Sequence, residues 1–476
     1  MKFRESKQRT DSGTITMEIA ESDNNIRQKA EELINIIKTR FITADGYLAR
    51  TYPAGSRTLF DNFDDIVPFF IFFNEVDFLL EQVHSIRKKK ESLLSLCSED
   101  GVLITRNIDE WFGGLYSLWE LTKDKDTYNL LKESVEFVLK YLMKDGFLSA
   151  AFYTKNRVSA SYYESWSAGL LETFCEIRGE FPAAFEEAQK VIRDWVESKY
   201  FIRHSLFPYR VYLSSTLSAV QERLLSRYFP LRRCSKPIAI RGNGKSNPAK
   251  RILKWTIFFA VNGLYSQLMK SNSTCAFTLL EFYRATGDRY WANSLLKWAA
   301  SAIESFCDYG KVYMEFVPKT GDKRDAGVTP AFILADILCD IIYFINDSNL
   351  AGRGRLLTVI KEILDYGWKS RLDNGMIPYS DCGDFAHIDS QIDFAISLRR
   401  FSELSGERLY KNRSIDLMKG VLEQHYSPEG YFTYSGKITN NVIDPKYNAL
   451  LLKGFANLIT IEKPLYPEYY SLFKDR

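Results

Sequence analysis

The chain has 476 residues, a formal net charge of +3 and a composition that is 46% hydrophobic and 14% aromatic. A charge so close to zero gives no general attraction to nucleic acid, and no nucleic-acid partner is expected. The seven cysteines are scattered and form no CxxC pair, which predicts reduced thiols rather than disulfides or a zinc site.

The chain begins with a polar stretch, residues 1–24, which predicts a disordered tail. This stretch has no apolar core of signal-peptide length, and a cytoplasmic protein is therefore expected. From Asn25 to Phe41 apolar residues recur on one face at helical spacing, which predicts an amphipathic helix. Residues 25–476 are expected to form one domain, because closed toroids reach such lengths around a continuous core.

A short connector recurs seven times along this domain. Each copy begins, as a rule, with an acidic or amide residue and a glycine, and then alternates apolar and polar residues. Glycine suits the positive φ of a tight turn, and the alternation is typical of a short strand. The copies begin at Asp45, Asp100, Asp145, Ser205, Tyr309, Asn374 and Glu429.

Two helices are expected between successive connectors, because most neighbouring copies lie about 45 to 65 residues apart. The first helix of each pair is rich in small and apolar residues and is expected to face an inner ring. The second has one charged face and belongs outside. The prediction is an all-α fold, an (α/α)6–7 toroid of helical hairpins with the short β-strand connectors at one end.

The repeated order of outer helix, connector strand and inner helix, with turns such as Thr286-Gly287-Asp288, resembles the six-hairpin and seven-hairpin glycosidase superfamily. The resemblance covers nearly all of residues 25–461. Similar architecture occurs in sugar epimerases, uronate lyases, terpenoid and lanthionine cyclases, and the C-terminal domain of glucuronyl C5-epimerases. It implies a carbohydrate-active enzyme, either a glycoside hydrolase or a lyase or epimerase acting on a uronate-containing oligo- or polysaccharide, but one fold hosts many reactions.

One insertion, at about 212–270, interrupts the repeat. From Arg223 to Lys254 it contains ten Lys or Arg and no acid. One interpretation is that residues 223–259 dock an anionic polymer or make a peripheral contact with an acidic membrane surface. The other is a solvated insertion whose helix completes the toroid wall, because runs of charge are commonly just solvated.

Candidate catalytic residues are expected at the starts of the inner helices, because connectors gather at one end of such a toroid and helix N-termini stabilise anions. Part of the acid enrichment there is structural, since Asp is a preferred N-cap. Glycoside hydrolysis needs one protonated and one ionised carboxyl group on either side of the scissile bond. The predicted catalytic residues are Asp64, Asp65, Glu164, Asp389, His387 and Tyr163.

Substrate binding is predicted for aromatic rings that stack on sugar faces and for bases that hold a uronate carboxylate. A lyase or epimerase would also need a Tyr, His or Lys base, and Tyr163, His387 and Lys446 fit that role. The predicted binding residues are Arg57, Arg106, Asp109, Glu110, Trp111, Trp166, Tyr379, Asp384 and Lys446.

No cofactor or metal is expected, because the sequence contains no HExxH motif, His-Cys cluster, phosphate loop or dinucleotide fingerprint. His387 is the one histidine of four expected at a connector, while His84 and His425 fall on outer helices. Its isolation argues against the paired histidines of the N-acylglucosamine 2-epimerase pattern. The alternative hypothesis is a non-catalytic toroid that binds a glycan, a lipid-linked sugar or a protein partner.

Overall fold

The computed structural model describes residues 12–474 apart from one long gap and several short ones. The residues outside the description are 51, 53–57, 99–100, 145–146, 161, 213–266, 319–320, 346–351, 381–385, 428 and 434–442, together with both chain ends. The basic stretch 223–259 therefore lies outside the described residues. Its two flanks, at 210–212 and 267–268, are described as short strands.

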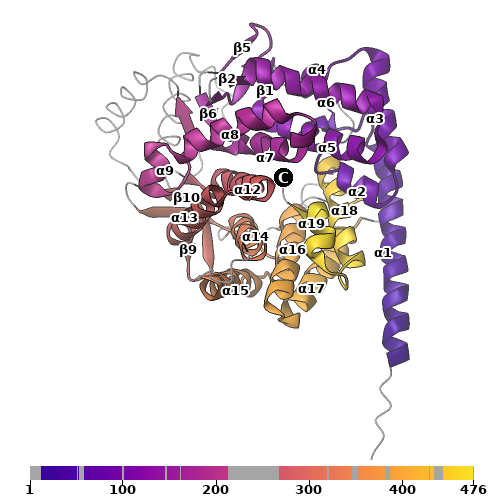
Figure 1. The fold of residues 1–476 in the computed structure, drawn as a ribbon. Coiled ribbons are helices and arrows are strands. Elements are labelled where there is room, and N and C mark those ends of the chain that lie inside the picture. The colour runs from indigo at the N-terminus through magenta and orange to yellow at the C-terminus, as the bar shows by residue number, and fades with distance from the viewer. Residues whose placement is uncertain are drawn as a thin grey trace, which may run out of the picture.

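The described helices form two concentric layers (Figure 1). Seven inner helices contact one another in chain order, and the last contacts the first, so the ring is closed. The upper of the two predicted hairpin numbers therefore holds for the described residues. The inner helices are α2 (Val67–Phe72), α5 (Thr105–Thr122), α7 (Gly169–Glu176), α12 (Met269–Thr286), α14 (Val328–Phe344), α16 (Ile388–Ser405) and α18 (Pro445–Ile459).

Each inner helix packs against one outer helix, and α1 packs on α18 to complete the last pair. The outer helices are α1 (Ser12–Arg40), α3 (Val76–Lys89), α6 (Lys125–Phe137), α8 (Pro182–Val196), α13 (Arg289–Phe306), α15 (Arg353–Lys369) and α17 (Arg408–His425). Shorter helical segments are η1 (Leu59–Asn62), α4 (Leu93–Cys97), η2 (Val138–Leu142), η3 (Ser165–Ala168), η4 (Ile177–Gly179), α9 (Lys199–His204), η5 (Leu465–Tyr469) and α19 (Tyr470–Phe473).

The first helix is longer than the sequence pattern predicts. It was expected to begin at Asn25, whereas α1 begins at Ser12, so half of the predicted disordered tail is helical. Helix-forming residues such as Met17, Glu18 and Ala20 continue the backbone pattern beyond the amphipathic part, and extending an existing helix costs far less than nucleating one.

Four of the seven connectors, those that begin at Asp100, Asp145, Ser205 and Tyr309, carry short antiparallel strands, as predicted. The other three make isolated β-bridges among the described residues. The connector glycines have positive φ, from +77° at Gly101 to +85° at Gly430, which is the tight turn that the sequence indicates. Strand pairs are β1–β4–β5, β2–β3, β6–β7 and β8–β10–β11, with β9 on β10. The strands are β1 (Val102–Ile104), β2 (Met143–Lys144), β3 (Phe147–Leu148), β4 (Ala151–Tyr153), β5 (Val158–Ser159), β6 (Tyr162–Glu164), β7 (Arg210–Tyr212), β8 (Gln267–Leu268), β9 (Cys307–Asp308), β10 (Lys311–Val317) and β11 (Asp322–Ala326).

A buried amide side chain fastens three of these connectors to the inner helix that follows. The amide is the fourth residue of α12, α16 or α18, and it pairs with both the N–H and the C=O of one connector residue. Asn448, for example, accepts from the N–H of Phe432 (2.8 Å) and donates to its carbonyl oxygen (3.0 Å). Asn272 and Gln391 make the same pair of bonds to Phe207 and Ile377.

We expect Asn448→Ala to lower the free energy of unfolding by about 2–4 kcal/mol, because it leaves two buried backbone groups without partners. Chemical denaturation of the variant and the wild type measures this difference. Asn412→Ala, an identical change at an exposed position of α17, is the matched control and is expected to change stability by less than about 0.5 kcal/mol. Equal stability of the two variants would show that the amide does not hold the connector.

The end of the chain closes the ring at the end opposite the connectors. The C-terminus lies in the middle of the ring of helices (Figure 1). Lys474 is buried among carboxylates of the inner helices, 2.7 Å from Glu172, 3.0 Å from Glu176 and 3.4 Å from Glu281. Charged groups from two inner helices and the C-terminal segment thus form a polar floor under the ring interior.

Among the described residues, the helices are too short or too polar to cross a membrane. The cysteines that the structure describes form no disulfide with one another, as predicted. Cys234 and Cys382 lie outside the described residues.

Candidate active site

Three carboxyl groups meet at the connector end of the ring. Asp64 and Asp65 follow η1 directly, and Glu110 lies in the second turn of α5; their carboxylate oxygens lie within 4.8 Å of one another. The backbone N–H of Asp64 donates to the carbonyl oxygen of Glu110 (2.7 Å), and Asn62 Nδ2 donates to Glu110 Oε2 (2.8 Å). These bonds fix the two segments against each other.

A glycine allows η1 to approach α5 this closely. A Cβ atom on Gly114, one turn after Glu110, would lie 2.8 Å from the carbonyl carbon of Phe63, closer than real Cβ contacts come. The absence of a side chain at this position therefore lets the Asp64–Asp65 segment reach the carboxyl group of Glu110.

Lys446 supplies positive charge to the three acids. It is the second residue of α18, and its Nζ lies 3.1 Å from Asp65 Oδ2. Burial works against the charge of Lys446, but Asp65 and Glu110 outweigh it and raise the pKa of this ammonium. Three carboxylates this close together could also bind a metal cation. In this structure the ammonium group of Lys446 supplies positive charge beside them.

Asp389, on the opposite side of the ring, faces the same space. It is the second residue of α16, and burial raises its pKa, although Lys446 and Lys270 act against the rise. The same two lysines act on Glu110, whose pKa is raised first by burial and then by the charge of Asp65. Asp389 Oδ1 is buried and has no hydrogen-bond partner within the described part of the chain.

Protein surrounds the residues of this site, although water still reaches them. Glu110 and Asp389 are partly exposed and Lys270 is exposed, yet burial is the largest influence on the pKa of each. Their charges are therefore screened less by water than charges on an open surface.

Two further bases lie against one indole ring. Arg106 Cζ lies 4.2 Å and Lys270 Nζ 4.6 Å from the centre of Trp166. Five residues of the site share one position, the second residue of a helix. They are Arg106 of α5, Trp166 of η3, Lys270 of α12, Asp389 of α16 and Lys446 of α18. The preceding residue is buried at each of these helix starts, so the second residue is the one that reaches the ring interior.

This shared position is the signal that would have identified Lys270, which the sequence analysis missed. The basic insertion directly precedes β8 and α12 and hid the start of that inner helix from the repeat pattern. Aligning all inner helices on their first buried residue would have placed Lys270 beside Arg106, Asp389 and Lys446.

His387 stacks on Tyr379, with 4.3 Å between the ring centres. Its nearest imidazole is His425, the last residue of α17. His425 is buried, its Nδ1 lies 2.9 Å from the carbonyl oxygen of Thr433, and its Nε2 has no hydrogen-bond partner within the described part of the chain. Burial lowers the pKa of His425, and His387 is close enough to lower it further. His387 is therefore less isolated than the sequence indicated.

The chain matches no protein-family model, and no curated protein matches its sequence. Solved structures do match. An α-1,2-mannosidase from Trichoderma reesei is 9% identical, with a TM-score of 0.60 over 93% of both chains. A D-mannose isomerase is 7% identical, with a TM-score of 0.55 over 95% of this chain and 100% of its own. A cellobiose 2-epimerase from Spirochaeta thermophila is 9% identical, with a TM-score of 0.54 over 76% and 88%.

These structures share this chain's fold, a toroid of helical hairpins. At such identities the similarity shows the fold alone, and the closed ring of hairpins agrees with the resemblance found in the sequence. Within this fold, the site described above occupies the connector end, where loops and helix starts meet on a rigid scaffold.

The ring places two other predicted site residues, Trp111 and Tyr163, away from this group. Trp111 is buried and donates from Nε1 to Ser134 Oγ of α6 (3.2 Å), between the two helix layers. Tyr163 is buried and stacks on Trp195, with 4.5 Å between ring centres. Glu164 lies in β6, in register with Arg210 of β7.

Asp109 faces the next inner helix, α7, where its Oδ1 accepts from Thr173 Oγ1 (2.6 Å). A Cβ atom on Gly169 would collide with this carboxyl group, so the glycine makes room for it. Burial raises the pKa of Asp109 well above its ordinary value. The remaining predicted residues, Arg57 and Asp384, lie outside the described residues.

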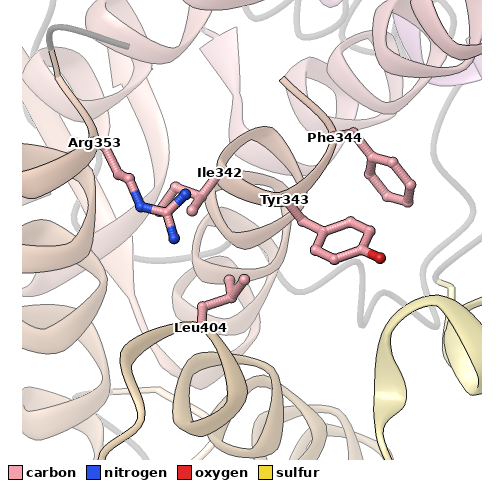
Figure 2. Close-up of a pocket in the computed structure, with 5 residues that line it drawn as sticks. All are labelled: Ile342, Tyr343, Phe344, Arg353 and Leu404. Atoms are coloured by element: carbon pink, nitrogen blue, oxygen red, sulfur yellow. The ribbon is translucent and has the colours of Figure 1, made fainter. Parts of the chain in front are cut away.

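A pocket of about 430 Å³ lies at the ends of α14 and α16 and the start of α15, away from the connectors (Figure 2). Arg353 is the one charged residue that lines it, and the lining contains no carboxyl group. This pocket therefore offers no acid–base pair. It is lined by Ile342, Tyr343, Phe344, Arg353 and Leu404.

Proposed function

We propose that this protein is a carbohydrate-active enzyme, and specifically a glycoside hydrolase in which Asp389 is the general acid and Asp65 the general base. One observation carries the proposal. Lys446 pairs with the carboxylate of Asp65 (3.1 Å), and its charge also acts on Asp389, a carboxyl group whose pKa burial raises. Hydrolysis of a glycosidic bond requires this combination of a protonated and an ionised carboxyl group.

In the proposed reaction, Asp389 donates its proton to the oxygen of the leaving sugar, and Asp65 removes a proton from the attacking water. The ammonium group of Lys446, 3.1 Å from Asp65 Oδ2, fixes the position of this carboxylate. Glu110, which shares the acidic group with Asp65, orients the same water or takes part in its deprotonation. Trp166 offers an aromatic surface for the face of a sugar ring.

The similarity to an α-1,2-mannosidase supports this class of reaction at the level of fold. A second candidate, sugar epimerisation or isomerisation, is favoured by a different observation. His387 and His425 lie close together at the same end of the ring, and the similar structures also include a D-mannose isomerase and a cellobiose 2-epimerase. In that reaction a histidine removes a proton from a carbon atom next to a carbonyl group.

Incubation in D2O with neutral and acidic oligosaccharides and with free monosaccharides separates the candidates. A hydrolase releases a shorter sugar without exchange at carbon, whereas an isomerase or epimerase introduces deuterium at C2, which NMR detects. We expect hydrolysis, and Asp65→Asn is expected to reduce it by about 10²- to 10⁴-fold. Glu120→Gln, at an exposed position near the far end of α5, is the control and should keep full activity.

Deuterium at C2 without bond cleavage would replace the hydrolase with the second candidate. Binding of saccharides without any turnover would favour the non-catalytic toroid instead.

A further inference from the structure

We infer that the substrate carries an anionic group, a carboxylate, sulfate or phosphate, which Arg106 and Lys270 bind beside the ring of Trp166. This inference rests on the proposed function, because it concerns the same site. The inference specifies that the substrate is an acidic sugar, and it assigns anion binding to Lys270.

The first step is that these two bases have no carboxylate partner, although acids surround them. Within the described part of the chain, Arg106 and Lys270 make no hydrogen bond or ion pair through their charged groups, and both contact Trp166 instead. Other bases on the inner helices are paired: Lys446 with Asp65 (3.1 Å) and Lys453 with Asp393 (2.8 Å). Within the described residues, Lys446 and Lys453 thus make direct ion pairs, whereas Arg106 and Lys270 keep their charged groups available to a ligand.

The second step concerns the charges around Lys270. Burial lowers the pKa of Lys270, and the positive charges of Lys446 and Arg106 lower it further, while the carboxylates of Glu110 and Asp65 act in the opposite direction. An anion placed between these groups would relieve the repulsion and would replace the water that both lose. Because the bases are less hydrated than on an open surface, such an anion is attracted more strongly than it would be in bulk water.

The third step is geometric. Arg106 lies at the start of α5 and Lys270 at the start of α12, and both helices pack against η3 and α7, which lie between them. The residue before each base is fully buried, so the two side chains start from fixed points. Thr105, which precedes Arg106, is anchored by a bond from its Oγ1 to the carbonyl oxygen of Ser149 (2.5 Å). A guanidinium group binds carboxylate and phosphoryl oxygens through two parallel bonds, and an ammonium adds a third contact.

The anionic group also lies near the reacting bond. The charge of Lys270 acts on Glu110, Asp65 and Asp389, so the site of the anion lies close to the site of chemistry. The anion therefore belongs to the sugar whose bond is broken or to its immediate neighbour. Both bases contact the ring of Trp166, which holds their side chains close together.

Calorimetric titration of the wild-type protein with four probes tests the inference without depending on turnover. The probes are methyl glucuronide, glucose 6-sulfate, glucose 6-phosphate and methyl glucoside, the neutral reference. We expect at least one anionic probe to bind at least about tenfold more tightly than the neutral one, and the order among the three anions identifies the charged group. Equal binding of all four probes would overturn the inference.

Variants then assign the preference to the two bases. Arg106→Gln and Lys270→Met are each expected to weaken binding of the preferred anion by about tenfold to a hundredfold, with little effect on methyl glucoside. In turnover assays the same variants should raise KM for the anionic substrate more than they lower kcat. Lys297→Met, an exposed position on α13, is the matched control and should leave binding unchanged.

Failure of the inference and failure of the proposed function give different results. If neutral glycosides are hydrolysed as well as anionic ones and both variants behave like the wild type, the anion site is wrong and the hydrolase stands. If anions bind at Arg106 and Lys270 but no glycoside of either class is cleaved, the binding site stands and the hydrolase is wrong.

Discussion

Asp389→Asn is expected to lower kcat/KM by about a thousandfold on a glycoside with an alkoxide leaving group, while the protein remains folded. The amide has the shape of the carboxyl group but cannot donate the proton that the leaving oxygen requires. Asp389 suits this role because burial raises its pKa, which shifts the equilibrium towards the protonated form. Its Oδ1 is buried and makes no hydrogen bond to another described residue.

The size of this loss should depend on the leaving group. A nitrophenolate departs without protonation, so Asp389→Asn is expected to retain activity to within about tenfold on the corresponding aryl glycoside. Asp65→Asn, which removes the proposed base, is expected to be slow on both substrates. Steady-state kinetics on the matched pair of glycosides measures this difference, and circular dichroism checks that each variant is folded.

The pH profile provides a second readout of the same role. A general acid must be protonated, so activity falls as the pH rises through the pKa of Asp389. Because burial raises that pKa, the alkaline limb of the profile should lie above the range of an ordinary aspartate. Asp389→Asn should lose this limb. Asp389→Asn could instead lose the same activity on both glycosides and keep the alkaline limb. That result would mean that another group, such as Glu110, donates the proton to the leaving oxygen.

Arg400→Met is expected to lower the free energy of unfolding by about 3–5 kcal/mol, because it leaves a buried carboxylate without its counter-ion. Arg400 and Asp340 are both fully buried, and the guanidinium Nη1 donates to Asp340 Oδ1 (2.7 Å). The other nitrogen, Nη2, donates to the carbonyl oxygen of Phe473 (2.6 Å). The substitution therefore disrupts the ring and the attachment of the C-terminal segment together.

Two tyrosines increase the dependence on this pair. Tyr466 and Tyr470 donate from their hydroxyl groups to the two oxygens of Asp340, at 2.5 Å and 3.1 Å. Burial raises the pKa of Asp340, and Arg400 is the largest opposing influence. Without Arg400, Asp340 must take up a proton or remain charged in a low-dielectric interior. Either change weakens the bonds that join Asp340 to the C-terminal segment.

Guanidinium chloride denaturation measures this loss, with Arg408→Met as the control. Arg408 is exposed at the start of α17, and its replacement should change stability by less than about 0.5 kcal/mol. A double variant, Arg400→Met with Asp340→Leu, should recover part of the loss, because it removes the unpaired charge. A single variant as stable as the wild type would mean that the pair contributes little to the closure of the ring.

The helical hairpins could be predicted from the sequence because the information for them is local. Glycine turns such as Gly46 and Gly375, alternating strands and helical periodicity recur at regular spacing, and each is decided by a few neighbouring residues. The resemblance to the superfamily followed from the same repeated units. The amide clamps made by Asn272, Gln391 and Asn448 are part of this repeat, although their role becomes visible only when the bonds are seen.

The candidate site could be predicted only in part. The sequence identified five residues of the site because they lie at connectors, and the structure brings them together. They are Asp64, Asp65, Glu110, Asp389 and Lys446. Trp111 and Tyr163 also lie at connectors, but their side chains point into the wall of the ring. A shift of one residue at a helix start turns a side chain by about 100°, so the start must be known to the residue before its direction can be predicted.

The sequence by itself determined the hairpin toroid, the end at which the connectors meet and most of the acids found there. Only the tertiary structure decided which residue at each helix start reaches the ring interior. It also decided that Lys270 and Arg106 both contact Trp166 and that the C-terminal segment closes the opposite end of the ring. The physical reason is that these features join residues far apart in the chain, such as Lys474 and Glu172. Such contacts depend on how the whole ring closes, whereas turns and helices depend on neighbouring residues.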